Sequence, residues 1–505
     1  MADLGSEHGS RRVNQSLPRN CIPRALRCRT SGEGSANDAI FALDCSNGPT
    51  QGPSCGPHSG ERRDGGPRQS ARHECSRSTA LNRLLGLDLH LIRRLSHSRA
   101  ARAFLLAVFI DAAGRGIFLT GSVLFYTQVI GLTSTQVGTG LSIAALCGLV
   151  CVVPISRLAD RVGAPRMLIA LQLWRAAGFL AYPLVDDFSG FLIAACFIGM
   201  AENAATPLLQ SIAGSIAEDD TPVGTMAAVS VVRNTAYSLA TLAATLFITL
   251  ADASAYIGFV LVNAVAFLIT AVLLLRVRGE LPRGVAVRQR GASVGALPWR
   301  DLRFVSLALL NGILFLHVAI LGVALPLWIV TQTSAPKPVV GVVLLINTVL
   351  AVALQVRFSR GGDDLAHAGR LQRRAGVALA VFCVLAAVSA GLGPMATTAV
   401  LLLAAVALTF GELWQSAGGW GVSFGLSPVD RRNFYLGLYN LGAGGFAVVG
   451  PGLLTVAVVG PGPVGWLVLG AVLLVTGVVT SLLTQRSARS REAGDAAVPS
   501  RAAEA

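Results

Sequence analysis

Long apolar segments separated by short polar breaks dominate the chain from residue 103 onward. A helix needs about 20 predominantly apolar residues to cross the hydrocarbon core of a bilayer. Twelve segments reach that length, so the pattern predicts twelve membrane-spanning helices. Their expected bounds are 103–129, 137–157, 165–184, 188–213, 222–250, 254–276, 304–331, 337–358, 374–393, 396–426, 432–458 and 462–484.

Composition agrees with lipid as the main solvent. Of the 505 residues, 53% are hydrophobic and 13% are charged, whereas soluble domains carry about 25% charged residues. We therefore expect neither a soluble enzyme nor a bound cofactor. Lys337 is the single lysine of the chain. A Walker phosphate loop requires a lysine after its glycine-rich run, so the chain has no P-loop ATPase of its own.

The segments outside the apolar runs have distinct compositions. Residues 1–102 hold 16 arginines against 9 acids, with many Ser, Gly and Pro. We expect a disordered basic tail there, in which residues 81–95 could form an amphipathic helix on the lipid surface. Residues 277–303 are expected to link two helix bundles, 103–276 and 304–484, and residues 485–505 to form a second disordered tail.

The arginines alternate between successive breaks. Positively charged short loops stay in the cytoplasm. Lys337 is the only basic residue that the odd-numbered breaks contain. Both termini are therefore predicted to be cytoplasmic. The strong excess of arginine over lysine is typical of a GC-rich bacterial genome, which suggests a multi-pass protein of a bacterial plasma membrane. The even-numbered breaks contain Arg161, Arg166, Arg278, Arg283, Arg288, Arg290, Arg360, Arg370, Arg373, Arg374, Arg431 and Arg432.

The two groups of six helices show weak internal similarity. Glu202 precedes Asp220 by the same number of residues as Glu412 precedes Asp430, and both glutamates follow runs of small residues. Repeated halves are typical of secondary transporters, whose substrate site lies near the midplane between the halves.

The break after the second segment resembles a family signature. Residues 156–166 read Ser-Arg-Leu-Ala-Asp-Arg-Val-Gly-Ala-Pro-Arg, which is similar to the loop G-x-L-A-D-R-x-G-x-x-R of the major facilitator superfamily. The resemblance implies an all-α membrane protein with two pseudo-symmetric six-helix bundles. It also implies that Asp160, Arg161 and Arg166 lock a cytoplasmic gate through charge pairs and helix-end contacts. Alternatively, they only cap helix ends and fix topology. Ser156 replaces the family's usual glycine, which suggests slightly looser packing.

Several predicted spans carry charged residues well away from their ends, namely Asp111, Arg115, Arg175, Glu202, Arg233 and Glu412. Each costs about 2.5–3.5 kcal/mol at the centre of a helix in lipid. We therefore expect these side chains to line a wet cavity or to pair with one another.

The spacing of these charges suggests partners. Asp111 and Arg115 are four residues apart and share a helix face, so Asp111 is either a proton-coupling site or part of a static pair. Arg233 is expected to neutralise Glu202 from the adjacent helix, in a fixed or a working pair. Glu412 has no arginine in its own helix, and we expect it to be protonated at rest. Further cavity candidates are Asn203, Asn234, Gln415, Asn311 and His317, although His317 could equally be a packing residue.

The sequence therefore predicts a secondary transporter that exports a small amphipathic or apolar compound, such as a drug or metabolite, in exchange for protons by alternating access. Its expected partners are that compound, protons and the bilayer. Neither nucleic acid nor metal is expected, and the chain is expected to be a monomer. Proton-coupled uptake of a nutrient or metabolite, and a membrane sensor or scaffold without transport, remain alternatives.

Export is inferred from the expected apolar cavity, because two antiporter features are missing. Drug and proton antiporters of the family carry an arginine in helix 4 where this chain has Ala195. The segment 222–250 lacks their Gly-Pro-x-x-Gly-type signature, and glycines cluster around Pro451 instead.

Overall fold

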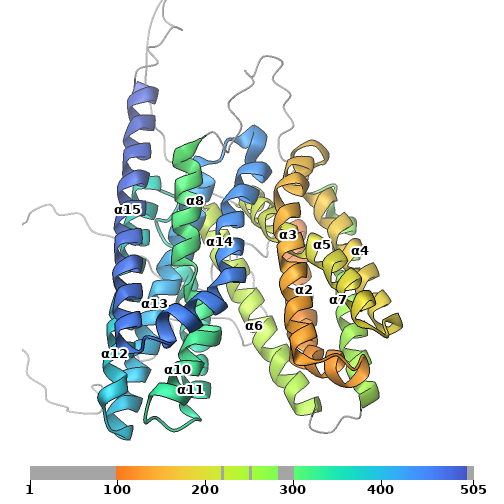
Figure 1. The fold of residues 1–505 in the computed structure, drawn as a ribbon. Helices are drawn as coiled ribbons and strands as arrows, with labels where there is room; N and C mark the ends of the chain where they lie inside the picture. The colour runs from red at the N-terminus through yellow and green to blue at the C-terminus, as the bar shows by residue number, and fades with distance from the viewer. Residues whose placement is uncertain (1–97, 218–220, 249–252, 282–300, 497–505) are drawn as a thin grey trace, which may run out of the picture. The chain divides into compact units, whose positions relative to one another are not determined.

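The computed structural model describes residues 98–217, 221–248, 253–281 and 301–496. The predicted amphipathic segment 81–95, nearly all of the tail 1–102 and most of the linker 277–303 lie outside these residues. Within them, all regular structure is helical. The twelve predicted spans are confirmed, in two bundles of six (Figure 1).

The N-terminal bundle contains the first six spans. The first is α2 with a π-helical last turn, η1, and the third is α4 with a 3₁₀ turn, η2. Eleven helices of the described chain are long and apolar enough to cross a membrane. Helix α6 lies at the position of the remaining predicted span. The elements are α2 Arg99–Leu124, η1 Phe125–Val129, α3 Ser134–Val162, α4 Ala164–Ala181, η2 Tyr182–Leu184, α5 Phe188–Ile216, α6 Pro222–Ile248 and α7 Ala253–Val277.

The C-terminal bundle contains the last six spans. Its first span is interrupted, and its fifth is flanked by a 3₁₀ turn and a π turn. The elements are α8 Leu302–Leu314, α9 His317–Ala319, η4 Ile320–Ala324, α10 Leu325–Gln332, α11 Val339–Phe358, α12 Leu365–Val388, η5 Ser389–Gly391, α13 Pro394–Leu426, η6 Val429–Arg431, α14 Arg432–Leu454, η7 Thr455–Val459 and α15 Pro463–Ala496.

Two helix ends differ clearly from the sequence prediction. Helix α12 begins at Leu365 and not at residue 374, because Asp364 caps it by accepting the backbone N–H of His367. Arg370, Arg373 and Arg374 therefore belong to its first turns and not to a loop. Helix α15 continues to Ala496, whereas residues 485–505 were expected to be a disordered tail. Hydropathy marks only the lipid-embedded part of a helix, and capped polar turns extend beyond it.

The two bundles share one pattern of helix neighbours. In the first, α2 packs against α6 and α7, α3 against α5, and α4 against α5 and α7. In the second, α8 packs against α14 and α15, α11 against α13, and α12 against α13 and α15. Each pair in one bundle thus has its counterpart in the other, as expected of a duplicated unit.

Contacts between the bundles follow the same symmetry. Helix α3 of the first bundle packs against α14 of the second, and α11 of the second packs against α6 of the first. These are equivalent pairs with the bundles exchanged. Small residues allow the close approach, since a Cβ at Gly437 of α14 would collide with the side chain of Ser156 in α3.

Candidate functional site

Four charged side chains in the N-terminal bundle form a closed ring. Asp111 and Arg115 come from α2, Arg175 from α4 and Glu202 from α5. Acids and arginines alternate, so that each carboxylate contacts both guanidinium groups. An alternating ring places every charge beside two opposite charges, which offsets the large cost of removing the four groups from water.

The distances define the ring. Arg175 lies 2.7 Å from an oxygen of Asp111 and 2.9 Å from an oxygen of Glu202. Arg115 lies 3.3 Å from the other oxygen of Asp111 and also pairs with Glu202. The amide nitrogen of Gln172 donates to Asp111 over 2.9 Å, and its oxygen accepts from Arg175. The predicted pair of Asp111 and Arg115 is thus present, as half of a larger arrangement.

Arg175 is the inner member of the ring. Its side chain is 1% exposed, against 14% for Asp111, 30% for Glu202 and 37% for Arg115. The guanidinium also lies over the ring of Phe267, 4.1 Å from its centroid, a cation–π contact. Sequence reasoning noted Arg175 as a buried charge but did not include it among the site candidates. The rotation of α4 toward α2 and α5, which brings it into the ring, leaves no signal in the sequence.

Arg233 does not neutralise Glu202, which corrects the sequence prediction. Both oxygens of Glu202 are taken by Arg115 and Arg175. Arg233 is exposed in the middle of α6 and makes no ion pair or hydrogen bond with any residue of the described chain. It lies within electrostatic range of Arg115, Asp111 and Glu412.

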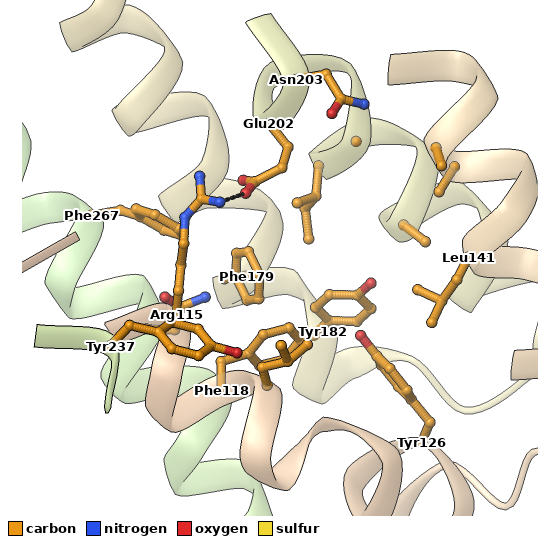
Figure 2. A pocket seen from close by; sticks show the side chains of 17 residues that line it. Arg115, Phe118, Tyr126, Leu141, Phe179, Tyr182, Glu202, Asn203, Tyr237 and Phe267 are labelled. Atoms are coloured by element: carbon orange, nitrogen blue, oxygen red, sulfur yellow. Dashed lines mark ion pairs between the residues drawn. The ribbon is translucent and has the colours of Figure 1, made fainter. Parts of the chain in front are cut away.

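A cavity of about 340 Å³ opens on one side of the charge ring. Figure 2 shows the Arg115 guanidinium directed at Glu202, with Tyr126, Tyr182 and Leu141 across the cavity. Tyr126 reaches the cavity from the π-helical turn η1, a type of turn that is frequent at functional sites. The lining is mostly aromatic and aliphatic, and it includes the predicted Asn203. Phe118, Phe179, Tyr182, Tyr237, Asn263 and Phe267 also line it and were not predicted.

A second cavity of about 250 Å³ also borders the ring. Asp111, Gln172 and Arg175 line it together with Arg233 and the predicted Asn234. Arg115 and Tyr237 border both cavities. The two cavities thus meet at Arg115 and Tyr237. We call the first the aromatic cavity and the second the Arg233 cavity.

Glu412 occupies a different environment in the C-terminal bundle. One of its oxygens accepts a hydrogen bond of 2.8 Å from the amide of Asn347 in α11, and that amide also donates to Thr409. No arginine pairs with Glu412 among the described residues. It therefore has a neutral hydrogen-bond partner where its counterpart Glu202 has two cations.

The remaining C-terminal candidates are buried in packing contacts. Asn311 accepts from the amide of Gln415 over 2.9 Å, so these two predicted residues do lie together. His317 is 3% exposed, and its Nδ1 lies 3.0 Å from the carbonyl oxygen of Leu314 in its own span. Neither Asn311 nor His317 lines the two cavities described above, which favours the packing role for His317.

Asp160 joins the two bundles at the end where α3 stops and α14 starts. Its carboxylate accepts the backbone N–H of Asn433 over 3.0 Å and that of Phe434 over 3.1 Å. These are among the first residues of α14, whose N–H groups have no partner within the helix. An acid at a helix N-terminus is also favoured by the helix dipole. Asp160 thus makes the helix-end contact that the loop signature implies.

Asp363 makes the reciprocal contact. It lies between α11 and α12 of the C-terminal bundle, and it accepts the backbone N–H of Val223 in the first turn of α6 over 2.8 Å. Burial raises the pKa of Asp363 above its ordinary value, and the hydrogen bond from Val223 opposes that rise. The sequence analysis missed this residue. A signal exists, since Arg360-Gly-Gly-Asp363 repeats the Arg-x-x-Asp spacing of Arg157-Leu-Ala-Asp160.

The arginines of the signature loop differ from expectation. Arg161 and Arg166 are exposed and form no ion pair within the described residues, so they do not make the expected charge pairs. Arg157 crosses the interface instead, 5.9 Å above the ring of Phe434. The looser packing expected at Ser156 is also wrong. Ser156 is fully buried, because the missing glycine is supplied from the opposite side by Gly437.

Comparison with known proteins places this arrangement in a family. The profile described as Major Facilitator Superfamily matches residues 104–353, which include nearly all of the N-terminal bundle, the Asp160 loop and the first part of the C-terminal bundle. The chain belongs to the major facilitator superfamily. It is a multi-pass membrane protein and a secondary transporter, and members of this family bind small-molecule substrates within the membrane.

Solved structures of several transporters have the same fold. A bacterial homologue of the iron transporter ferroportin, in its outward-facing state, has a TM-score of 0.60 at 15% identity, covering 77% of this chain and 99% of that one. The transporter FucP in the outward conformation has a TM-score of 0.58 at 13% identity, covering 76% and 98%. The human organic anion transporter MFSD10 has a TM-score of 0.53 at 14% identity, covering 77% and 98%. No curated protein sequence matches the chain significantly.

Proposed function

We propose that this transporter moves a small amphipathic or apolar compound out of the cell in exchange for protons, by alternating access. The observation that carries the proposal is the aromatic cavity beside the charge ring. Ligand sites are concave and largely apolar, with a few polar groups that fix orientation. A chamber with aromatic walls and a polar end at Arg115 and Glu202 suits an amphipathic compound.

The reciprocal helix caps support the alternating-access part of the proposal. Asp160 holds α14 of the opposite bundle, and Asp363 holds α6 of the opposite bundle. A rocking motion that opens this end must break both contacts. The arginine-rich loops at the same end support a cytoplasmic location for it and for both termini, in a bacterial plasma membrane. One chain supplies both bundles, so we propose a monomer as the working unit.

Glu412 is the proton carrier that the geometry favours. Protonating Asp111 or Glu202 would break a ring in which each acid contacts two arginines. Glu412 accepts from the neutral Asn347, and its protonation breaks no ion pair. A membrane-embedded acid without a cation partner gains or loses a proton at the smallest structural cost.

Transport in vesicles tests this proposal. Inverted vesicles with an acidic interior are supplied with a panel of aromatic acids, aromatic amines and neutral aromatic compounds, and proton release and compound accumulation are followed together. We expect one class to accumulate and to release protons. Glu412→Gln should remove the dependence on the proton gradient, whereas Glu280→Gln, which changes an exposed acid paired with Arg99 at 3.8 Å, should not. Absence of flux in both inverted and right-side-out vesicles would refute the proposed transport and favour the alternative of a membrane sensor or scaffold.

Proton-coupled uptake is the second candidate, and Arg233 is the observation that favours it. An ionised Glu412 within electrostatic range of Arg233 competes with an anionic substrate, whereas a protonated Glu412 does not. Proton and anion would then bind together and move in the same direction. Accumulation in right-side-out vesicles, and none in inverted vesicles, would establish uptake in place of export.

A further inference from the structure

Arg233 is an uncompensated positive charge beside a cavity. The four other charges in the middle of the N-terminal spans, Asp111, Arg115, Arg175 and Glu202, form the ring and balance one another. Arg233 is exposed to the Arg233 cavity and has no acidic partner within ion-pair distance there. Charges inside membrane helices are costly and mark substrate or ion sites. An anionic group is the ligand that such an arginine binds best.

Tyr237 connects this arginine to the aromatic cavity. It follows Arg233 by four residues on α6, so the two side chains share a helix face and lie about 6 Å apart along the axis. Tyr237 borders both cavities. A ligand whose charged group contacts Arg233 can therefore extend past Tyr237 into the aromatic cavity.

The aromatic cavity contains a polar group without a partner. Asn263 of α7 is 1% exposed, and neither the nitrogen nor the oxygen of its amide has a hydrogen-bond partner in the described chain. It lines the cavity together with Phe118, Phe179 and Phe267. Buried amides nearly always have a partner. A ligand with a hydroxyl or carbonyl group on its apolar body would supply one.

We propose that the two cavities together form the binding site of an amphipathic organic monoanion, of which an aromatic carboxylate is the simplest form. Arg233 binds the carboxylate, the aromatic cavity holds the ring system, and Asn263 bonds a polar substituent. The proposal rests on the proposed function, in which these cavities hold the transported compound, and it applies to export and to uptake. A cationic substrate is disfavoured, because both acids of the ring are already held by two arginines each.

Binding to the purified full chain tests the charge preference without a gradient. The protein is placed in nanodiscs of zwitterionic lipid, and affinities are measured by calorimetry for 2-naphthoate, 2-naphthamide, 2-naphthylmethylamine and acetate. We expect 2-naphthoate to bind about tenfold or more tightly than the amide, since a hydrogen bond to a charged group is worth that factor. The amine and acetate should bind more weakly than 2-naphthoate. Equal or tighter binding of the amide or the amine, or no binding of any probe, would overturn the proposal.

Variants assign the preference to Arg233. Arg233→Gln should make 2-naphthoate and 2-naphthamide bind with equal affinity, and Arg233→Lys should keep part of the preference. Arg276→Gln is the matched control, because Arg276 is an exposed arginine in the last turn of α7 and lines neither cavity. Phe118→Ala should weaken the binding of both 2-naphthoate and 2-naphthamide, while the preference for the carboxylate persists. An unchanged preference in Arg233→Gln would refute the assignment.

The result is separable from that of the transport experiment. If 2-naphthoate binds through Arg233 but no vesicle preparation shows flux, the anion site stands and the proposed transport fails. If flux is proton-dependent but the carboxylate has no advantage in binding, transport stands and the anion site fails.

Discussion

The N-terminal and C-terminal bundles have the same helix neighbours but solve the problem of buried charge differently. At the fourth helix of the first bundle, Glu202 closes a ring of four charges around the buried Arg175. At the fourth helix of the second bundle, Glu412 accepts from a neutral asparagine. The pseudo-symmetry therefore applies to the arrangement of the helices and not to the partners of the two glutamates. A duplicated scaffold can hold a ring of ion pairs in one half and, in the other, an acid whose hydrogen-bond partner is neutral.

Under the proposed function, this difference separates the residues that stabilise the fold from the acid that carries the proton. Removing one member of a buried ion pair leaves an unpaired charge in a medium that solvates it poorly. Neutralising an acid that only accepts a hydrogen bond from an amide leaves no such charge. We therefore expect substitutions in the ring to affect folding first, and substitution of Glu412 to affect proton coupling first.

The largest expected effect is that of Arg175→Met. Loss of a buried ion partner costs about 3–5 kcal/mol, so we expect little monodisperse protein in detergent and a much lower unfolding temperature. Glu412→Gln should remain within about 1 kcal/mol of the unmodified protein, because the glutamine can still accept from Asn347. Equal stability of the two variants would contradict the inferred difference between the bundles, in which the charge ring stabilises the fold and Glu412 does not.

A double variant sharpens this test. Arg175→Met combined with Asp111→Asn removes one charge of each sign, so the ring is neutral again. We expect the double variant to be more stable than Arg175→Met alone, which fluorescence-detected size-exclusion chromatography after heating would measure. A double variant less stable than the single one would contradict charge balance as the reason for the ring.

A smaller effect is expected at the reciprocal caps. Loss of an N-capping side chain costs about 1 kcal/mol, which changes a two-state ratio roughly fivefold. Asp160→Ala removes the acceptor of two N–H groups, and Asp363→Ala that of one. Spin labels at the exposed positions Arg161 and Val429, in a cysteine-free background, would report separation of the bundles at this end. We expect long distances to increase more in Asp160→Ala than in Asp363→Ala.

Asp364→Ala is the control for these caps. Asp364 is adjacent to Asp363, but it caps its own helix by accepting from His367. Its loss should leave the distance distribution between the bundles unchanged. A shift as large as that of Asp363→Ala would show that the caps act through local helix stability and not through the contact between bundles.

The smallest effect is expected from the pH dependence of Asp363. Burial in the contact with α6 raises its pKa above the ordinary value, so the closed arrangement holds the proton more tightly than an open one. Lowering the pH through the raised pKa should therefore favour closure, and raising it should weaken closure. The same spin labels should show fewer long distances at lower pH, and Asp363→Asn should remove this part of the dependence. An identical dependence in Asp363→Asn would contradict the assignment.

The candidate site could be predicted only where its geometry is local. Asp111 and Arg115 pair because a four-residue spacing puts them on one helix face. The Asp160 contact followed from a loop signature, and the Asp363 contact could have followed from the repeated Arg-x-x-Asp spacing. The partners of Glu202 were predicted wrongly, because neighbours in the chain, α5 and α6, are not the helices that face each other at that depth.

The sequence by itself determined the twelve spans, their approximate bounds and the need for buried charges to find partners. These properties follow from transfer free energies that add residue by residue along one helix. Only the tertiary structure decided that Arg175 closes the ring, that Arg233 stays unpaired beside a cavity and that Gly437 accommodates Ser156. Those outcomes depend on the rotation and depth of each helix relative to its neighbours. Packing of many side chains sets these two variables together, so no single segment of sequence contains them.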